Sequence, residues 1–146
     1  MIEVRAMEAA DAPRWRALWA AYNRFYEASV ADHVTEQTLA RLLDPGSSLV
    51  GRVAVRDGAM IGFSASVIHE ATWDTRAVCY LEDLYVDETA RGFGAGRALI
   101  EDLIALAHRH NWGRLYWHTR AGNDTARRLY DHFTQADDFV RYRLFF

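Results

Sequence analysis

Three glycines at alternate positions lie in the segment Arg91-Gly92-Phe93-Gly94-Ala95-Gly96, between an apolar stretch and an amphipathic one. Because glycine has no Cβ, the backbone of such a turn can curl until several N–H groups point at one anion. The stretch after the turn has helical periodicity, and a helix N-terminus carries a partial positive charge. The spacing therefore predicts a phosphate-binding turn at the start of a helix.

Other glycine-rich turns fit the spacing less well. A dinucleotide-binding fingerprint requires a third glycine where Arg97 stands, and a P-loop requires a lysine, which the chain lacks altogether. What remains is Arg-x-x-Gly-x-Gly followed by Arg97, which resembles the acetyl-CoA pyrophosphate loop of the GNAT acetyltransferase superfamily.

Two carboxylates, Glu82 and Asp83, stand in the middle of the most apolar predicted strand. An unpaired ionised carboxylate in such a place costs several kcal/mol, so each is either a buried acid with a polar partner or a functional group. Successive strand side chains point to opposite faces, so only one of the two can face a given cleft unless a bulge intervenes. A desolvated carboxylate has a raised pKa, and we predict Glu82 as the general base for an amine, acting directly or through a water.

A predicted helix after the fifth strand carries Asn123, Arg127 and Tyr130 on one face, because their spacing is four and three residues. A phenol with an ordinary pKa of about 10 stays protonated at neutral pH. It could protonate a departing thiolate at a cost of about 2 kcal/mol, since a thiol has a pKa near 8.5. We therefore predict Tyr130 as the general acid.

The resemblance extends over most of residues 76–146. The segments 80–86 and 91–96 are similar to the core of the diamine (spermidine/spermine-type) acetyltransferases, whose glutamate at the Glu82 position serves as base. Tyr116-Trp117-His118-Thr119 and the helix that follows are similar to the fungal histone and D-amino-acid acetyltransferases. The resemblance implies a site for acetyl-CoA made of these residues: Leu84, Tyr85, Val86, Arg91, Gly92, Phe93, Gly94, Ala95, Gly96, Arg97, Asn123, Arg127 and Tyr130.

Within that set the resemblance assigns the backbone of Leu84 and Val86 to the pantetheine arm and residues 91–97 to the pyrophosphate. Asn123 would contact the pantetheine, and Arg127 would reach the CoA phosphates. The segment 134–139 departs from the usual Gly-Phe of the family, which predicts an altered final hairpin.

Composition indicates one domain over residues 1–146, with 51% hydrophobic residues available for a core. The single cysteine, Cys79, lies in an apolar run and reads as a core thiol in a reducing compartment. No apolar run long enough for a membrane span and no signal-peptide pattern is present, so we expect a cytoplasmic protein without a membrane partner. The net charge of −3 argues against nucleic acid as a partner.

The charge is uneven along the chain. Residues 1–88 hold 8 arginines against 14 acidic residues, a net charge of −6, whereas residues 89–146 hold 9 against 6, a net charge of +3. The second half is therefore suited to a polyanionic cofactor and the first half to a cation.

Periodicity predicts strands along the chain and two helices in each half. The resemblance implies that they form a GNAT-type α/β (α+β) fold with a mixed and mostly antiparallel sheet. The predicted strands are 2–6, 49–55, 60–69, 78–86, 115–119 and 139–145. The predicted helices begin at Asp11-Ala12-Pro13, at Thr35, at about residue 95 and at Asn123 or Asp124, and the last one ends near Phe133. The cofactor is expected between strands 78–86 and 115–119, as parallel neighbours.

The acceptor is the least constrained part of the interpretation. Tyr22 and Tyr26 share an aromatic helix face that could hold a cation by cation–π contact, and Glu27 and Asp83 add negative charge. We expect transfer of acetyl from acetyl-CoA to a small cationic amine, a polyamine or an amino acid, by direct attack. The alternatives are a peptide or histone-like amine, or an idle acyl-CoA-binding module. A homodimer is expected from exposed aromatic residues, and the histidine spacing indicates no metal site.

Overall fold

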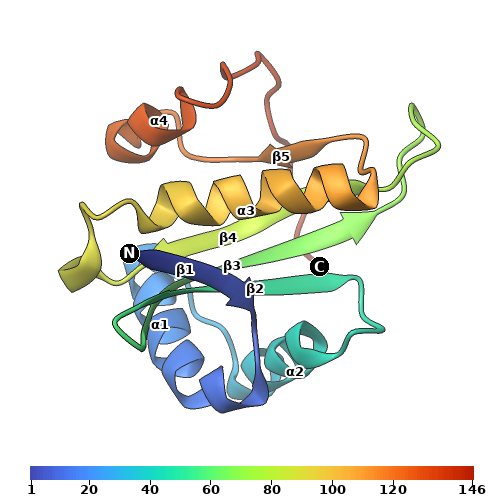
Figure 1. The fold of residues 1–146 in the computed structure, drawn as a ribbon. Coiled ribbons are helices and arrows are strands. Elements are labelled where there is room, and N and C mark those ends of the chain that lie inside the picture. The colour runs from blue at the N-terminus through green and yellow to red at the C-terminus, as the bar shows by residue number, and fades with distance from the viewer.

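A computed structural model describes all residues 1–146, and its centre is one five-stranded sheet in the order β1-β2-β3-β4-β5 (Figure 1). The strands are β1 (Ile2–Ala6), β2 (Leu49–Arg56), β3 (Ala59–His69), β4 (Val78–Val86) and β5 (Leu115–Trp117). Every neighbouring pair is antiparallel except β4 and β5, which run parallel. A parallel pair needs a long crossover, and the helix between β4 and β5 supplies it. The predicted mixed sheet is confirmed.

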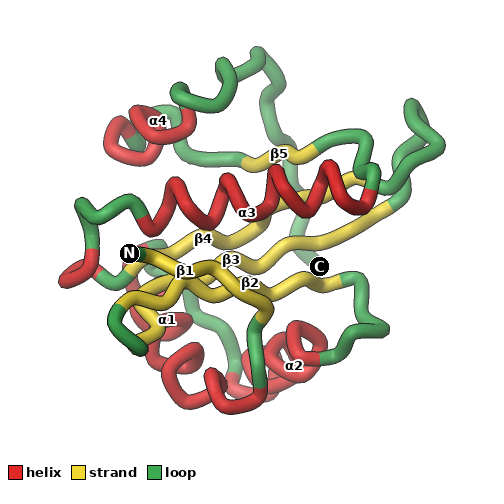
Figure 2. Tube along the Cα trace, in the orientation of Figure 1, coloured by secondary structure: helices red, strands yellow, loops and turns green.

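Helices cover both faces of this sheet (Figures 1 and 2). They are α1 (Ala12–Phe25), α2 (Asp32–Leu43), α3 (Ala95–His110) and α4 (Asp124–Tyr130), with short 3-10 turns η1 (Ala9–Asp11) and η2 (Glu88–Ala90). Helix α3 lies along one face, whereas α1 and α2 lie on the other, and α4 lies beside β5. No helix is both long and apolar enough to cross a bilayer.

The larger core lies between the sheet and α1 with α2. Trp15, Leu18 and Trp19 of α1 are buried there, and the two indole rings stack with centroids 5.1 Å apart. The ring of Phe63 on β3 meets both indoles at 6.1 Å. This aromatic layer sets the position of α1 over β3 and β4.

The second face is closed by α3, whose apolar stripe is buried as expected. Leu99, Ile100 and Leu103 are completely buried against the sheet. The ion pair of Arg52 on β2 with Asp102 on α3, at 2.7 and 2.8 Å, fastens the helix to the sheet. Cys79 is completely buried, and burial raises the pKa of its thiol to about 11, which is consistent with the predicted core thiol.

Three element boundaries differ from the predicted ones by more than one residue. Helix α2 begins at Asp32 rather than Thr35, and β5 ends at Trp117 rather than Thr119. Helix α4 ends at Tyr130 because the next amides, of His132 and Phe133, bond three residues back instead of four.

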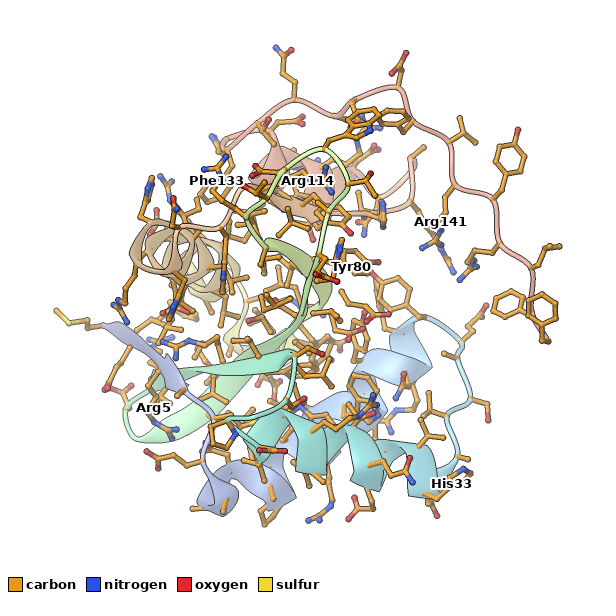
Figure 3. The ribbon with its side chains drawn as sticks, turned by 90° about the vertical axis from the view of Figure 1, so that its right-hand side faces the viewer. Arg5, His33, Tyr80, Arg114, Phe133 and Arg141 are labelled. Atoms are coloured by element: carbon orange, nitrogen blue, oxygen red, sulfur yellow. The ribbon has the colours of Figure 1, made fainter.

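The sixth strand predicted over residues 139–145 is not formed, and that prediction is wrong for this structure. A strand needs a neighbour for its backbone N–H and C=O groups, and the segment after α4 pairs with none. Figure 3 shows it running past the labelled Arg141 at the margin of the molecule. Its large apolar side chains are all exposed: Phe139, Val140, Tyr142, Leu144, Phe145 and Phe146.

Candidate active site

The glycine turn lies between η2 and α3, where the sequence placed it. Gly92 and Gly94 have φ angles of +86° and +87°, a backbone region that other residues rarely adopt. Gly96 serves a different purpose, because a Cβ there would lie 3.2 Å from the side chain of Leu129 on α4. The first two glycines therefore shape the turn, and the third lets α4 approach α3.

The N-terminus of α3 is open. Gly94 is its N-cap, and no side chain satisfies the amides of the first turn. The helix has 16 residues and carries no acidic residue in that turn, so its dipole is not offset by a negative charge. Such an end is suited to an anion, and phosphate binding at this turn stays a prediction.

The two arginines of the turn are exposed but already engaged. Arg91 donates from Nε to the carbonyl of Val86 at 3.2 Å, and Arg97 pairs with Glu101 at 2.8 Å. Phe93 is 56% exposed, with the guanidinium of Arg56 3.7 Å above its ring. A diphosphate would thus meet the turn amides first, with Arg91 and Arg97 at its margin.

Strand β4 loses its β5 neighbour halfway along its length. The two strands pair only from Cys79 to Leu81, opposite Leu115 to Trp117. From Glu82 to Val86 the β5 side of β4 has no strand partner, so its backbone groups, apart from the Val86 carbonyl that Arg91 occupies, are free for a ligand. The side chain of Tyr85 is buried in the α1 core, which leaves only its backbone for such a role. The predicted place for the cofactor, between these two strands, is compatible with this geometry.

A β-bulge in β4 decides where the two carboxylates point. Ala65 of β3 pairs with Asp83 and Ser66 pairs with Leu81, so Glu82 is the extra residue. Leu81 and Leu84 pack toward α3, although strict alternation would place them on opposite faces. Glu82 and Asp83, which lie between these two leucines, can therefore both point toward the face of the sheet that α1 covers. Burial is the main cause that raises the pKa of Tyr22 and of Asp83, and the negative charge of Glu82 adds a smaller rise to both, which is consistent with that placement.

The less exposed carboxylate of this pair is that of Asp83. Glu82 is exposed, contrary to the burial expected for it, whereas Asp83 is half-buried. Burial raises the pKa of Asp83 to about 6, and a hydrogen bond from Tyr22 opposes that rise. The hydroxyl of Tyr22 donates to Oδ1 of Asp83 at 2.8 Å. Burial, and next the charge of Asp83, raise the pKa of Tyr22, so its proton stays in place as a donor.

Aromatic rings extend from this carboxylate to the edge of the molecule. The rings of Tyr22 and Tyr26 are in edge contact with centroids 5.0 Å apart, and the guanidinium of Arg120 lies 5.6 Å from the centroid of Tyr26. Sequence reasoning singled out both tyrosines but missed Arg120, which belongs to none of the recognised motifs. Glu27 is exposed in the turn after α1, and its side chain makes no hydrogen bond with the others.

Tyr130 at the end of α4 lies where β4 and β5 diverge. Its ring meets Trp117 of β5 with centroids 5.5 Å apart, and it packs against the cluster that lines α3. Burial raises the pKa of Tyr130 to about 12, with a smaller contribution from Tyr26 on the opposite face. The phenol therefore keeps its proton at neutral pH, but it is a weaker acid than the ordinary phenol assumed from the sequence.

The other two residues of the predicted α4 face have structural contacts. Asn123 caps α4, accepting the amide of Ala126 at 3.3 Å, and its amide nitrogen donates to Thr119 at 3.3 Å. Arg127 donates to the carbonyl of Ala121 at 2.8 Å. Both hold the turn between β5 and α4, whether or not they also contact a cofactor.

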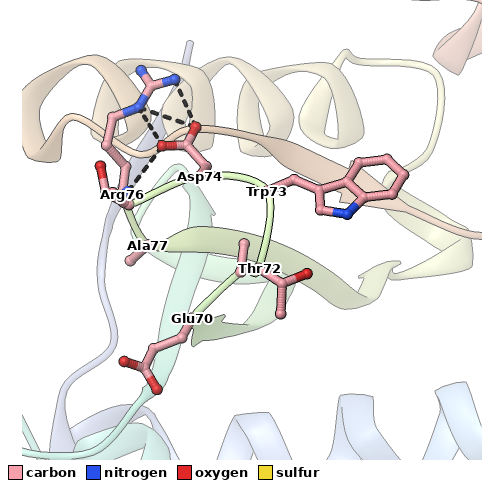
Figure 4. A pocket seen from close by; sticks show the side chains of 8 residues that line it. Glu70, Thr72, Trp73, Asp74, Arg76 and Ala77 are labelled. Carbon is pink, nitrogen blue, oxygen red and sulfur yellow. Dashed lines mark hydrogen bonds and ion pairs between the residues drawn. The ribbon is translucent and has the colours of Figure 1, made fainter.

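A hollow of about 700 Å³ lies far from these residues, inside the β3–β4 loop of residues 70–77 (Figure 4). Two of its charged residues, Arg76 and Asp74, satisfy each other through hydrogen bonds of 2.8 to 3.2 Å. Trp73 projects from the loop and is 91% exposed. The loop joins β4 at the end opposite the glycine turn, so this hollow is not part of the candidate site. No cluster of three or more His, Cys, Asp or Glu side chains suited to a metal ion is present.

Two features of this structure are expected of an acyl-CoA transferase. One is the helix α3, whose open N-terminus follows a glycine turn, and the other is the pair of parallel strands, β4 and β5, that separate from each other. Residues 15–134 match the model of the acetyltransferase (GNAT) family. The chain belongs to this family, and it is an N-acetyltransferase that uses acetyl-CoA.

Among individual proteins, the D-amino-acid N-acetyltransferase HPA3 of Saccharomyces cerevisiae is 35% identical over 144 residues, which cover 97% of this chain and 89% of the yeast protein. A solved structure of a probable acetyltransferase has a TM-score of 0.86 at 20% identity, covering 99% of this chain and 97% of the other. The ribosomal-protein-alanine N-acetyltransferase of Brucella melitensis biovar Abortus 2308 has a TM-score of 0.77 at 22% identity, with both chains covered completely. These two structural likenesses establish the fold alone.

Proposed function

We propose that the acceptor is a small amine that carries a positive charge, and that it is a free amino acid rather than a polyamine. The observation that carries the proposal is the half-buried carboxylate of Asp83, which accepts a hydrogen bond from Tyr22, whose ring is in contact with that of Tyr26. A carboxylate and aromatic faces together favour an ammonium group. The yeast relative named for D-amino-acid acetylation supports an amino acid over a polyamine.

In the proposed reaction Asp83 holds the acceptor ammonium and Glu82 receives its proton, directly or through a water. Glu82 is exposed at the bulge, so it can pass the proton on to solvent. The neutral amine attacks the thioester carbonyl, and the new C–N bond replaces the C–S bond. The sulfur leaves with the proton of Tyr130, and the proton that the attacking nitrogen loses restores the Tyr130 phenol. The amides of the turn from Gly92 to Gly96 and the backbone of β4 would bind the coenzyme.

The test is a screen of acetyl transfer over D- and L-amino acids, polyamines, aminoglycosides and short peptides, followed by the Tyr130→Phe variant on the best acceptor. If the phenol is the acid, turnover falls by about two orders of magnitude or more. Binding of CoA, followed by thermal shift, should be retained. Tyr142→Phe is the matched control, since Tyr142 is 93% exposed at the chain end.

Two results would contradict the proposal. Acetylation of peptides with no activity on free amines would move the acceptor to the peptide class. Equal turnover of Tyr130→Phe and the parent enzyme would remove Tyr130 from proton transfer, while leaving the acceptor assignment intact.

A further inference from the structure

Arg120 places an unpartnered positive charge beside the acceptor residues. It lies in the turn between β5 and α4, where its carbonyl accepts the amide of Asn123 at 3.0 Å and so fixes its backbone. Its side chain is exposed and forms no ion pair. Its guanidinium carbon lies 5.6 Å from the centroid of the Tyr26 ring.

The arginines of the predicted cofactor site differ in this respect. Arg91, Arg97 and Arg127 each donate a hydrogen bond to a carbonyl or a carboxylate of the chain. Arg120 therefore has all its N–H donors available for a ligand. These donors lie on the acceptor side of the site, next to Tyr26.

The site thus has two opposite poles, the carboxylate of Asp83 and the guanidinium of Arg120, with Tyr22 and Tyr26 between them. A free amino acid is a zwitterion with the complementary pair of charges. A polyamine and a lysine side chain carry the ammonium but no carboxylate next to it, so neither would use the second pole.

We propose that Arg120 binds the α-carboxylate of an amino acid whose ammonium group is held by Asp83. This inference rests on the proposed amino-acid acceptor and names the residue that selects it. A guanidinium presents two parallel N–H donors that match a carboxylate. The ammonium and carboxylate of an amino acid are about 3 Å apart and each adds a hydrogen bond of about 2.9 Å, so poles about 9 Å apart suffice. The exposed Arg120 side chain has the freedom to close that distance.

The experiment compares Arg120→Gln with the parent enzyme on two acceptors, the best free amino acid and its carboxamide. The carboxamide keeps the amine and the side chain but lacks the carboxylate. We expect kcat/KM for the free acid to fall about 10- to 100-fold, the usual effect of losing a hydrogen bond to a charged group. We expect kcat/KM for the carboxamide to change less than about twofold, and the KM for acetyl-CoA also to change less than about twofold. Comparing the two enzymes on each acceptor cancels the different amine pKa values of acid and carboxamide.

Arg128→Gln is the matched control, because Arg128 is an exposed α4 residue whose guanidinium reaches only Thr125 Oγ1, at 3.3 Å. It should leave both acceptors unchanged. An equal loss on acid and carboxamide, or no loss on the acid, would overturn the role of Arg120 while leaving the amino-acid acceptor in place. If no free amino acid is acetylated by the parent enzyme, the proposed acceptor and the role of Arg120 both fail.

Discussion

The hydrogen bond from Tyr22 to Asp83 makes a prediction about pH that can be worked out from the structure. Burial raises the pKa of Asp83 to about 6, and the hydroxyl of Tyr22 at 2.8 Å keeps it from rising further. A hydrogen bond to a charged acceptor is worth about 1.5 to 3 kcal/mol. Taking the lower end for a group at the edge of the core, Tyr22→Phe should raise the pKa of Asp83 by about one unit, to about 7.

The expected change in activity is therefore largest in mild acid. At pH 6 the ionised fraction of Asp83 should fall from about one half to about one tenth, a fivefold loss, whereas at pH 8 it should fall by only about one tenth. If acceptor binding needs the ionised carboxylate, the ratio of variant to parent kcat/KM follows these fractions. Measuring the ratio from pH 5.5 to 8.5 cancels titration of the amine, which is common to both enzymes.

Tyr26→Phe is the control for this prediction, because the hydroxyl of Tyr26 forms no hydrogen bond with Asp83. Whatever its level of activity, its ratio to the parent enzyme should not vary with pH. A ratio for Tyr22→Phe that stays constant from pH 5.5 to 8.5 would refute the reasoning, since it would mean that Asp83 does not titrate in this range or is not used.

The same ionisation should be visible in stability. With a folded-state pKa of about 6 against the ordinary 3.8, Asp83 holds its proton more tightly in the folded than in the unfolded chain. Its contribution to the free energy of unfolding is greatest below pH 4 and falls by about 3 kcal/mol as the pH rises through 6. Chemical denaturation of Asp83→Asn should lack this decline, whereas an unchanged decline would assign it to other groups.

Three further predictions concern the frame of the site and the assembly. Gly94 has a φ of +87°, so Gly94→Ala should lower the free energy of unfolding by about 1 kcal/mol and weaken acetyl-CoA binding, as measured by KM and thermal shift. Gly122 has no positive φ, so the control Gly122→Ala should change neither quantity. Arg52→Ala leaves the half-buried Asp102 unpaired and should lower the free energy of unfolding by about 3 kcal/mol in urea titration; no loss would mean that water replaces the guanidinium. The exposed apolar side chains of residues 139–146 lead us to expect a homodimer that becomes a monomer when they are removed; light scattering that gives one mass for both chains would contradict this.

Local patterns were sufficient for most of the fold. A single element that is buried against a neighbour shows this burial in the spacing of its own apolar residues. Examples are the apolar stripe of α3, with Leu99, Ile100 and Leu103, and the long apolar run of β4. The glycine turn was readable for the same reason, since its positive φ angles depend on single residues. The prediction of a strand over residues 139–145 was wrong. The pattern indicates a segment that is suited to strand pairing, but a strand also requires a neighbouring strand, which this segment does not have.

The amino-acid sequence by itself determined the turn from Gly92 to Gly96, the phenol at Tyr130 and the presence of two acids in β4. Only the tertiary structure decided that the bulge makes Glu82 the exposed acid and Asp83 the half-buried one, because that choice depends on the register between β3 and β4. The partners of Asp83 and of Tyr26 were equally beyond the sequence. Tyr22 lies 61 positions from the carboxylate that it bonds. Arg120 gains its place beside Tyr26 from the packing of α1 against the sheet, which no local spacing encodes.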